Sequence, residues 1–196
     1  KSSEVGFSTI FEIITPENEK KCVIPNMVIG DKVDGIIFMG QINDDYMQEI
    51  IKTGLPYMLL DFYDEKNKND CVVSDGISGA YDLTTHLLKS GHNRIGFVGS
   101  IMATTSILDR YLGYYKALIK HKITFDDKII IPDRDENGRF IELNLPQNLP
   151  SAFVCNCDEV AYLLVEKLKS AGYKIPEDIS VVGFDDFRFA TISSPQ

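Results

Sequence analysis

Two stretches decide the fold of this chain: Gly91-His92-Asn93-Arg94-Ile95-Gly96-Phe97-Val98-Gly99 and Ser180-Val181-Val182-Gly183-Phe184-Asp185-Asp186. Each is a short apolar run that begins after a turn signal and ends in small or acidic residues. Such a run is typical of a strand that is buried on both faces of a parallel sheet. Ligands of open α/β sheets bind at the carboxyl ends of these strands. The polar residues that follow the two runs are therefore the first candidates for a functional site.

Further apolar runs extend this pattern along the chain. We expect additional strands at 33–40, 55–61, 71–74, 129–131 and 152–156. Residues at helical spacing predict helices at 43–53, 77–89, 106–120 and 158–171, with Asn43 and Asp158 as N-caps and Gly54 and Gly91 as C-terminal signals. Because strands and helices alternate without a hairpin signal, the order predicts an α/β fold with parallel sheets and right-handed crossovers.

Two regions give weaker signals. Near the N-terminus, Phe7, Ile10, Phe11 and Ile14 lie at helical spacing, so we expect a helix at 7–14. Cys22-Val23-Ile24 is expected to be a short strand. Residues 133–150 are polar and loop-like, with a turn at Asn137-Gly138.

Composition limits the classes of partner. The chain has 196 residues, 44% of them hydrophobic, which suffices for one sizeable core or two small cores that share a cleft. The formal net charge is −9. A surface this acidic repels phosphate backbones, so the chain by itself is expected to be a poor nucleic-acid binder.

The four cysteines give no metal or disulfide pattern. Cys22, Cys71, Cys155 and Cys157 form no Cys-x-x-Cys pair, and no histidine stands at metal-ligand spacing from them. Cys155 and Cys157 are expected to be two small buried thiols in a reducing, cytoplasmic compartment, with a strained disulfide between them as the alternative. No apolar run approaches the length of a membrane span and no secretory signal begins the chain. No metal or cofactor is expected.

Five motifs, in order and at matching distances, resemble the lactose/galactose repressor (LacI/GalR) family. They stand at Val33–Ile37, Leu55–Asp61, Val73–Ile95, Asp109–Tyr114 and Ile175–Asp186. The resemblance covers residues 33 to the end. It implies two Rossmann-like lobes of the periplasmic-binding-protein kind, which close on a small ligand, a sugar or a nucleobase, in the cleft between them.

The resemblance also implies a domain arrangement and partners. Residues 1–91 would form the N-terminal lobe without its opening strand, 92–188 the C-terminal lobe, and 189–196 the start of the crossover back. A helix-turn-helix headpiece, which binds operator DNA in the family, is not visible in this chain. The expected function is that of an effector-sensing domain in a homodimeric regulator.

Asp185 and Arg110 are the strongest ligand-binding candidates. Asp185 follows a strand at its carboxyl end, where a carboxylate can accept two sugar hydroxyls; the alternative is a capping or turn acid. Arg110 lies early on a helix and presents a planar fork of donors; the alternative is an ion pair with Asp109 or neighbouring glutamates on a solvated helix face. The match to the family favours ligand contact for both.

Four further residues are candidates. Asp75 leaves a strand just before a helix, so it serves as a ligand, an N-cap or both. Phe62 stands where it can stack on a sugar ring or base, or pack in a core, and Asp61 ends the strand before it. Asn156 is offset from the family pattern, which commonly has Asn directly before Asp158, where this chain has Cys157. Strand alternation would turn Asn156 to the other face.

Two acids and one arginine fit a neutral polyol better than a sugar phosphate, so a neutral carbohydrate is the expected effector. A solute-binding protein of a transporter is the first alternative, because the fold would be the same. An α/β sugar-processing enzyme is the second, with Asp75 and Asp185 as paired acids. Against it, the chain has no Gly-x-Ser-x-Gly or His-Glu-x-x-His motif. His92 is expected to be structural.

Overall fold

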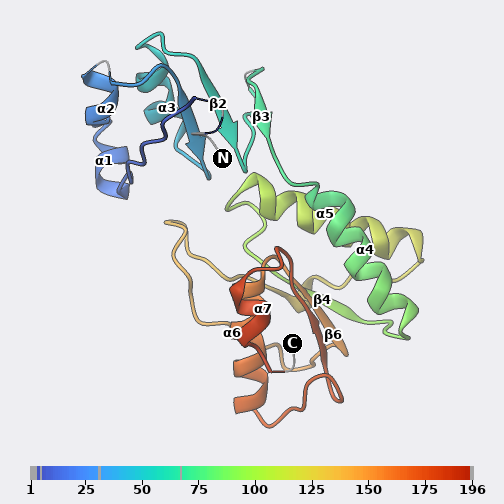
Figure 1. Cartoon of the computed structure of the whole chain (residues 1–196). Helices are drawn as coiled ribbons and strands as arrows, with labels where there is room; N and C mark the ends of the chain where they lie inside the picture. The colour runs from blue at the N-terminus through green and yellow to red at the C-terminus, as the bar shows by residue number, and fades with distance from the viewer. Residues whose placement is uncertain (1–3, 5, 31, 67, 195–196) are drawn as a thin grey trace. The chain divides into compact units, whose positions relative to one another are not determined.

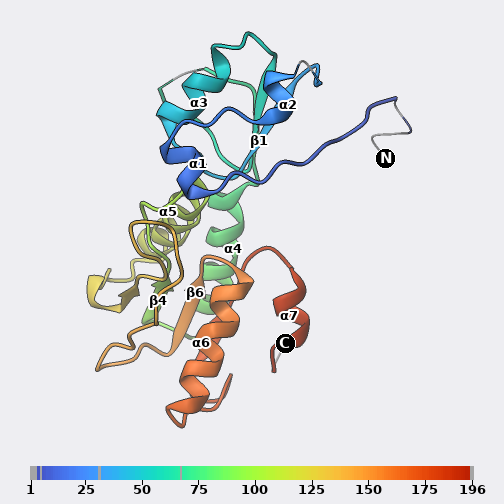
Figure 2. The same cartoon turned by 90° about the vertical axis from the view of Figure 1, so that its left-hand side faces the viewer.

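The computed structural model describes residues 4, 6–30, 32–66 and 68–194. The chain divides into two compact units, Lys1–Val73 and Ser74–Gln196. Both are α/β units with parallel sheets (Figures 1 and 2), so the predicted fold class is confirmed. Among the described residues, no helix combines the length and apolar character needed to cross a bilayer.

The first unit contains a three-stranded parallel sheet in the order β1-β2-β3. Its elements are α1 (Pro16–Lys20), α2 (Asn26–Ile29), β1 (Ile36–Met39), α3 (Asp44–Ile51), β2 (Tyr57–Leu60) and β3 (Cys71–Val72). The core forms where Phe38 of β1 and Leu59 of β2 pack against Tyr46, Met47 and Ile50 of α3. Asn43 caps α3, as predicted, by accepting a hydrogen bond from the Asp45 N–H at 2.9 Å.

The beginning of this unit differs from two expectations. Residues 7–14 are not a helix, because no helical hydrogen bonds form there, and Phe7, Phe11 and Ile13 are 70%, 81% and 90% exposed. Residues 22–24 are not a strand but an irregular link between α1 and α2. Glu12 explains part of the local course, since its carboxylate accepts the N–H groups of Asn26 and Met27 at the start of α2.

The second unit contains a four-stranded parallel sheet in the order β5-β4-β6-β7. Its elements are α4 (Gly76–Lys89), β4 (Ile95–Val98), α5 (Thr105–Lys120), the 3₁₀ turn η2 (Asp127–Ile129), β5 (Ile130–Ile131), β6 (Ala152–Cys155), α6 (Asp158–Ser170), β7 (Ser180–Val182) and α7 (Arg188–Ile192). The chain goes from β4 to β5 on one side and then to β6 on the other. The topological switch point therefore lies between β4 and β6.

The two faces of this sheet carry separate cores. Ile95, Phe97 and Val154 belong to the cluster with α4 and α5, whereas their neighbours Val98 and Phe153 belong to the cluster with α6. The helices accordingly lie on opposite sides of β4 and β6 (Figure 1). All residues of β4 and β6 are buried, which is why their sequence is a continuous apolar run.

Helices α4 and α5 pack closely because of a glycine. A Cβ at Gly113 would overlap the carbonyl oxygen of Ile77 and lie 3.0 Å from Tyr81 N, so only glycine lets the two backbones approach. Gly76 repeats this close approach beside Arg110, whose Cγ lies 3.3 Å from the position of a Cβ. The start of α4 is thereby held against the first turns of α5.

Most predicted elements of the second unit are present within a few residues, and Asp75 caps α4. Asp158 is not an N-cap: Cys157 takes that place and Asp158 is the first helical residue. Helices α1, α2 and α7 were not predicted. The predicted lobe boundary at Gly91 stays a prediction, while the compact units divide before α4.

Replacing Gly113 with alanine should destabilise the second unit. Alanine is normally better than glycine in a helix by about 1 kcal/mol. Here the added methyl must push apart two backbones, so we expect the unfolding free energy to fall by about 1–3 kcal/mol. Urea denaturation followed by circular dichroism measures the change. Leu112→Ala, at a 42% exposed position of the same helix, is the control and should change stability much less.

Stability should fall at alkaline pH because of Tyr114. Its hydroxyl donates to Ile95 O at 2.8 Å, and burial strongly raises the pKa of Tyr114, with smaller contributions from Tyr111 and Asp126. The unfolded chain therefore loses this proton first, so the stabilisation is complete below about pH 10 and declines above it. Urea titrations from neutral pH upward should show a shallower decline for Tyr114→Phe. An unchanged slope would contradict this, and exposed Tyr173→Phe is the control.

Candidate functional site

Polar side chains gather where the strands of the second sheet end, at the topological switch point. Gly99 and Ser100 follow β4, and Asp133 and Arg134 follow β5 with one proline between. Asn156 and Cys157 follow β6, and Asp185 comes soon after β7. Parallel strands place these ends along one edge of the sheet. This is the edge at which open α/β sheets bind ligands.

Asp133 connects three of these strand ends. Its carboxylate has no exposed surface and accepts hydrogen bonds from Ser100 N at 2.7 Å, Asn156 Nδ2 at 2.9 Å and Arg134 Nε at 3.1 Å. A buried carboxylate is tolerated only with such donors. The three bonds therefore fix the loops after β4, β5 and β6 relative to one another.

The Ser100 hydroxyl adds a second tie between two of these loops. It donates to Arg134 O at 2.9 Å and accepts the N–H groups of Asp133 at 3.1 Å and Arg134 at 2.8 Å. One side chain thus satisfies three backbone groups of the segment after β5. This explains why the segment is ordered without regular secondary structure.

Arg110 reaches this edge from α5. Its Nη1 donates to Asn156 O at 2.6 Å and its Nη2 donates to Asp185 Oδ1 at 2.8 Å. The guanidinium also lies over the Phe184 ring, 4.1 Å from the centroid. The Arg110 side chain is 8% exposed, whereas that of Asp185 is 38% exposed. The carboxylate is thus the part of this ion pair that a ligand in solution can reach.

The turn that carries Asp185 has an unusual backbone. Asp185 and Asp186 have φ values of +104° and +51°, a region that favours glycine. Asp158 holds this turn at both ends, because its N–H donates to Phe184 O at 2.9 Å and its carboxylate accepts Phe187 N–H at 2.7 Å. The hydrogen bonds from Asp158 of α6 therefore maintain this backbone conformation. In it, the Asp185 side chain lies against Arg110.

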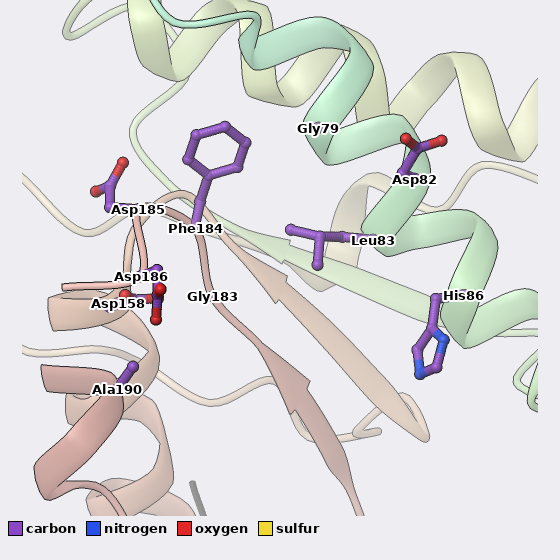
Figure 3. Close-up of a pocket in the computed structure, with 10 residues that line it drawn as sticks. All are labelled: Gly79, Asp82, Leu83, His86, Asp158, Gly183, Phe184, Asp185, Asp186 and Ala190. Atoms are coloured by element: carbon purple, nitrogen blue, oxygen red, sulfur yellow. The ribbon is translucent and has the colours of Figure 1, made fainter.

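A pocket of about 610 Å³ opens beside this turn, entirely within the second unit. Asp82, Leu83 and His86 project from α4 on one side, and the turn with Asp158 forms the other (Figure 3). Phe184 points toward Gly79, where a Cβ would lie 2.5 Å from the ring. The complete lining comprises Gly79, Asp82, Leu83, His86, Asp158, Gly183, Phe184, Asp185, Asp186 and Ala190.

The structure brings together three of the predicted site residues, Arg110, Asp185 and Asn156. The Asn156 side chain belongs to the Asp133 network, since its Nδ2 donates to Val98 O at 3.0 Å as well as to Asp133. Whether it faces the ligand stays a prediction. Its Oδ1 is buried and accepts no hydrogen bond from the described residues. Asn156 is 1% exposed, so it holds the surrounding groups in position from the interior of the unit.

Asp75 begins α4 next to this group. It accepts the Ser78 N–H at 2.9 Å, and this bond lowers the pKa of Asp75. The following residue, Gly76, contacts Asp109 and Arg110. The capping role is thus established, and the ligand-binding role stays a prediction.

Phe62 and Asp61 belong to the first unit. Phe62 is 2% exposed and lies in the core cluster around Phe38. Asp61 is exposed and has a φ of +68° at the turn after β2. Ligand contact by these two residues stays a prediction.

Asp133 and Arg134 were not predicted from the sequence. The signal that could have identified Asp133 and Arg134 is their position after the apolar run 129–131, by the same rule that singled out Asp185. Cys157 lies two residues after the end of β6 and is the N-cap of α6. Burial raises the pKa of the Cys157 thiol, while the charge of Arg134 lowers it and that of Asp185 raises it. The thiol is therefore neutral at physiological pH.

Comparison with known proteins shows the family. The profile of the periplasmic binding protein-like domain matches residues 84–196, which is more than half of the chain. The chain belongs to this family. Among curated relatives, this periplasmic-binding-protein-like chain is 31% identical over 204 residues to the arabinose metabolism transcriptional repressor of Geobacillus stearothermophilus, covering 96% of the chain and 55% of the relative.

A second curated relative and a solved structure are also similar to this chain. The HTH-type transcriptional repressor PurR of Vibrio atlanticus (strain LGP32) is 29% identical over 186 residues, covering 90% of the chain and 55% of the relative. The crystal structure of a transcription regulator from Lactobacillus plantarum has a TM-score of 0.80 at 22% identity, covering 100% of the chain and 74% of that structure. The latter likeness concerns the fold.

These findings confirm the resemblance to LacI/GalR-type effector-binding domains. Both of these curated relatives are named as transcriptional repressors. The chain spans about half the length of the curated relatives it matches.

Asn156→Leu should destabilise the domain although leucine has a similar size. The change removes two hydrogen bonds of the Asn156 amide and leaves Asp133 and Val98 O with fewer donors in a buried site. We expect a loss of about 2–4 kcal/mol in unfolding free energy. Urea denaturation measures it, with Asn144→Leu in the exposed loop as the control. Equal stability of the two variants would mean that the network adds little.

Proposed function

We propose that this domain senses a small carbohydrate effector bound at the carboxyl ends of the strands of its second unit, in a cleft closed by the two lobes. The observation that carries this proposal is the set formed by Arg110, Asp185 and Asn156 at the topological switch point. Asp185 offers an accessible carboxylate, and Arg110 holds it in place. Among the described residues, no group of three or more His, Cys, Asp or Glu is placed to hold a metal.

The chemistry of these groups suits a sugar. A carboxylate accepts hydrogen bonds from two adjacent hydroxyls, and each such charge-assisted bond contributes about 1.5–3 kcal/mol in a desolvated site. Phe184 adds an aromatic surface against which C–H groups of a pyranose can pack. One relative, the Geobacillus stearothermophilus protein, is named as a repressor of arabinose metabolism, which is consistent with a carbohydrate signal.

The whole protein would be a homodimeric, cytoplasmic regulator that binds operator DNA through a helix-turn-helix headpiece. A ligand that binds the closed arrangement of the lobes more tightly than the open one shifts the population toward closure. This shift would move the headpieces and change DNA affinity, and reciprocally DNA would change effector affinity. No bond of the effector is made or broken in this scheme.

A thermal-shift screen of the purified chain tests the function. Sugars, nucleobases and amino acids are the panel. A ligand at about 100 times its dissociation constant should stabilise the chain by about 2.7 kcal/mol, a rise of a few degrees in midpoint. We expect one sugar class to give this rise and to be recovered unmodified. A response only to nucleobases or amino acids would reject a carbohydrate effector.

Substitution at Asp185 tests whether the ligand binds at this residue. Asp185→Asn should lower the affinity of the identified sugar about 10-fold or more, because a charged acceptor becomes neutral. Asp127→Asn, an exposed acid of the same unit, is the matched control. If Asp185→Asn and the double variant Arg110→Ala with Asp185→Ala bind the sugar as wild type does, the ligand binds elsewhere.

A further inference from the structure

Arg134 is a second cation at the same strand ends. Its backbone is fixed by the Ser100 hydroxyl, and its Nε donates to the buried Asp133 carboxylate at 3.1 Å. The guanidinium lies over the Phe140 ring, 4.8 Å from the centroid. The side chain is 21% exposed. Arg134 is therefore clamped on two sides while part of it remains accessible.

The contacts with Asp133 and Phe140 leave the terminal nitrogens of Arg134 available to donate hydrogen bonds to a ligand. Among the described residues, the Arg134 guanidinium donates one hydrogen bond, from Nε to Asp133, and Nη1 and Nη2 donate none. This contrasts with Arg110, whose Nη1 and Nη2 are both engaged. A planar pair of donors with its stem immobilised is the arrangement that binds carboxylate or phosphate most strongly.

The two acids that flank Arg134 in sequence already accept hydrogen bonds. Asp133 already receives three donors and has no exposed surface. The Asp135 carboxylate accepts the N–H groups of Asn137 and Arg139 within the turn of its own loop. Asp185 is paired with Arg110, and the Cys157 thiol is neutral. An incoming anion would thus meet an unshared pair of Arg134 donors.

Arg134 is connected to the effector site by a continuous chain of bonds. Asp133 joins Arg134 to the Asn156 side chain, and the Asn156 carbonyl joins this chain to Arg110 and Asp185. All of these residues lie in the second unit. One small ligand spanning the strand ends could therefore meet Asp185 with its hydroxyls and Arg134 with another group.

We propose that Arg134 binds an anionic group of the effector, a carboxylate or a phosphate, and makes the domain selective for acidic sugars over neutral ones. This inference rests on the proposed function, because it concerns the same ligand. It also revises the expectation of a neutral polyol, which counted one arginine at the site. Arg134 is the specificity-determining residue and Phe140 a positioning residue.

Matched ligand pairs test this selectivity. The wild-type chain is titrated with glucose against glucuronate and against glucose 6-phosphate, with galactose against galacturonate, and with inorganic phosphate alone, at constant ionic strength. We expect an acidic member to raise the thermal midpoint more than its neutral partner. Uronates that bind without the phosphates identify a carboxylate, and the reverse result identifies a phosphate. Inorganic phosphate serves as the minimal anion probe.

Variants assign the effect to Arg134. Arg134→Gln should weaken the acidic ligand about 10- to 100-fold and leave its neutral partner nearly unchanged. Arg139→Gln is the matched control, an exposed arginine of the same loop whose recorded hydrogen bond is through its backbone. Arg134→Lys keeps the charge without the fork, so it should lose more affinity for a uronate than for a phosphate. Far-UV circular dichroism confirms folding.

If Arg134→Gln does not fold, Phe140→Leu replaces it, since this 44% exposed ring can be removed while the Arg134–Asp133 bond remains. A several-fold loss for the acidic ligand alone is then expected. Neutral sugars that bind as well as acids, with Arg134 variants unaffected, would overturn the role of Arg134 and leave the sensing function intact. No Arg134-dependent response to any acid, inorganic phosphate included, overturns it as well. No response to any compound in either screen rejects both proposals.

Discussion

The buried charge of Asp133 is the constraint on which the site depends. A carboxylate without exposed surface is costly unless donors surround it, and its three donors come from the loops after β4, β5 and β6. These donors converge only when the three strands end at the same level. Hydrophobic burial stabilises the sheet, whereas the Asp133 charge determines how the loops at the carboxyl ends of its strands are arranged.

Asn156 connects the Asp133 network to the neighbouring helix α5. Its side chain belongs to the Asp133 network, and its backbone carbonyl accepts a hydrogen bond from Arg110 of α5. Arg110 in turn holds Asp185 on a turn with positive φ values. Two arginines from different elements are thus held in fixed positions through one asparagine. A site of this kind is organised before a ligand arrives, which reduces the entropy lost on binding.

The sequence predicted the second sheet well, since buried strands such as Ile95–Val98 are continuous apolar runs that leave little choice of structure. It failed at residues 7–14, where helical spacing of apolar residues was preferred over their β-branched and aromatic character. Asp158 was assigned as an N-cap because aspartate commonly is one, whereas its carboxylate bonds Phe187 instead. Asp133 was missed because the importance of a buried acid depends on donors distant in sequence.

The exposed segment 7–14 has a practical consequence for handling this polypeptide. Phe7, Ile10, Phe11 and Ile13 are exposed in a segment that is neither helix nor strand and has no proline, and only Glu12 interrupts them with a charge. Such a stretch has the composition of strands that recruit other strands by edge-to-edge pairing. Self-association through this segment, rather than loss of the folded core, would then limit the concentration that the chain tolerates, and a lysine in place of Phe11 would act as a gatekeeper.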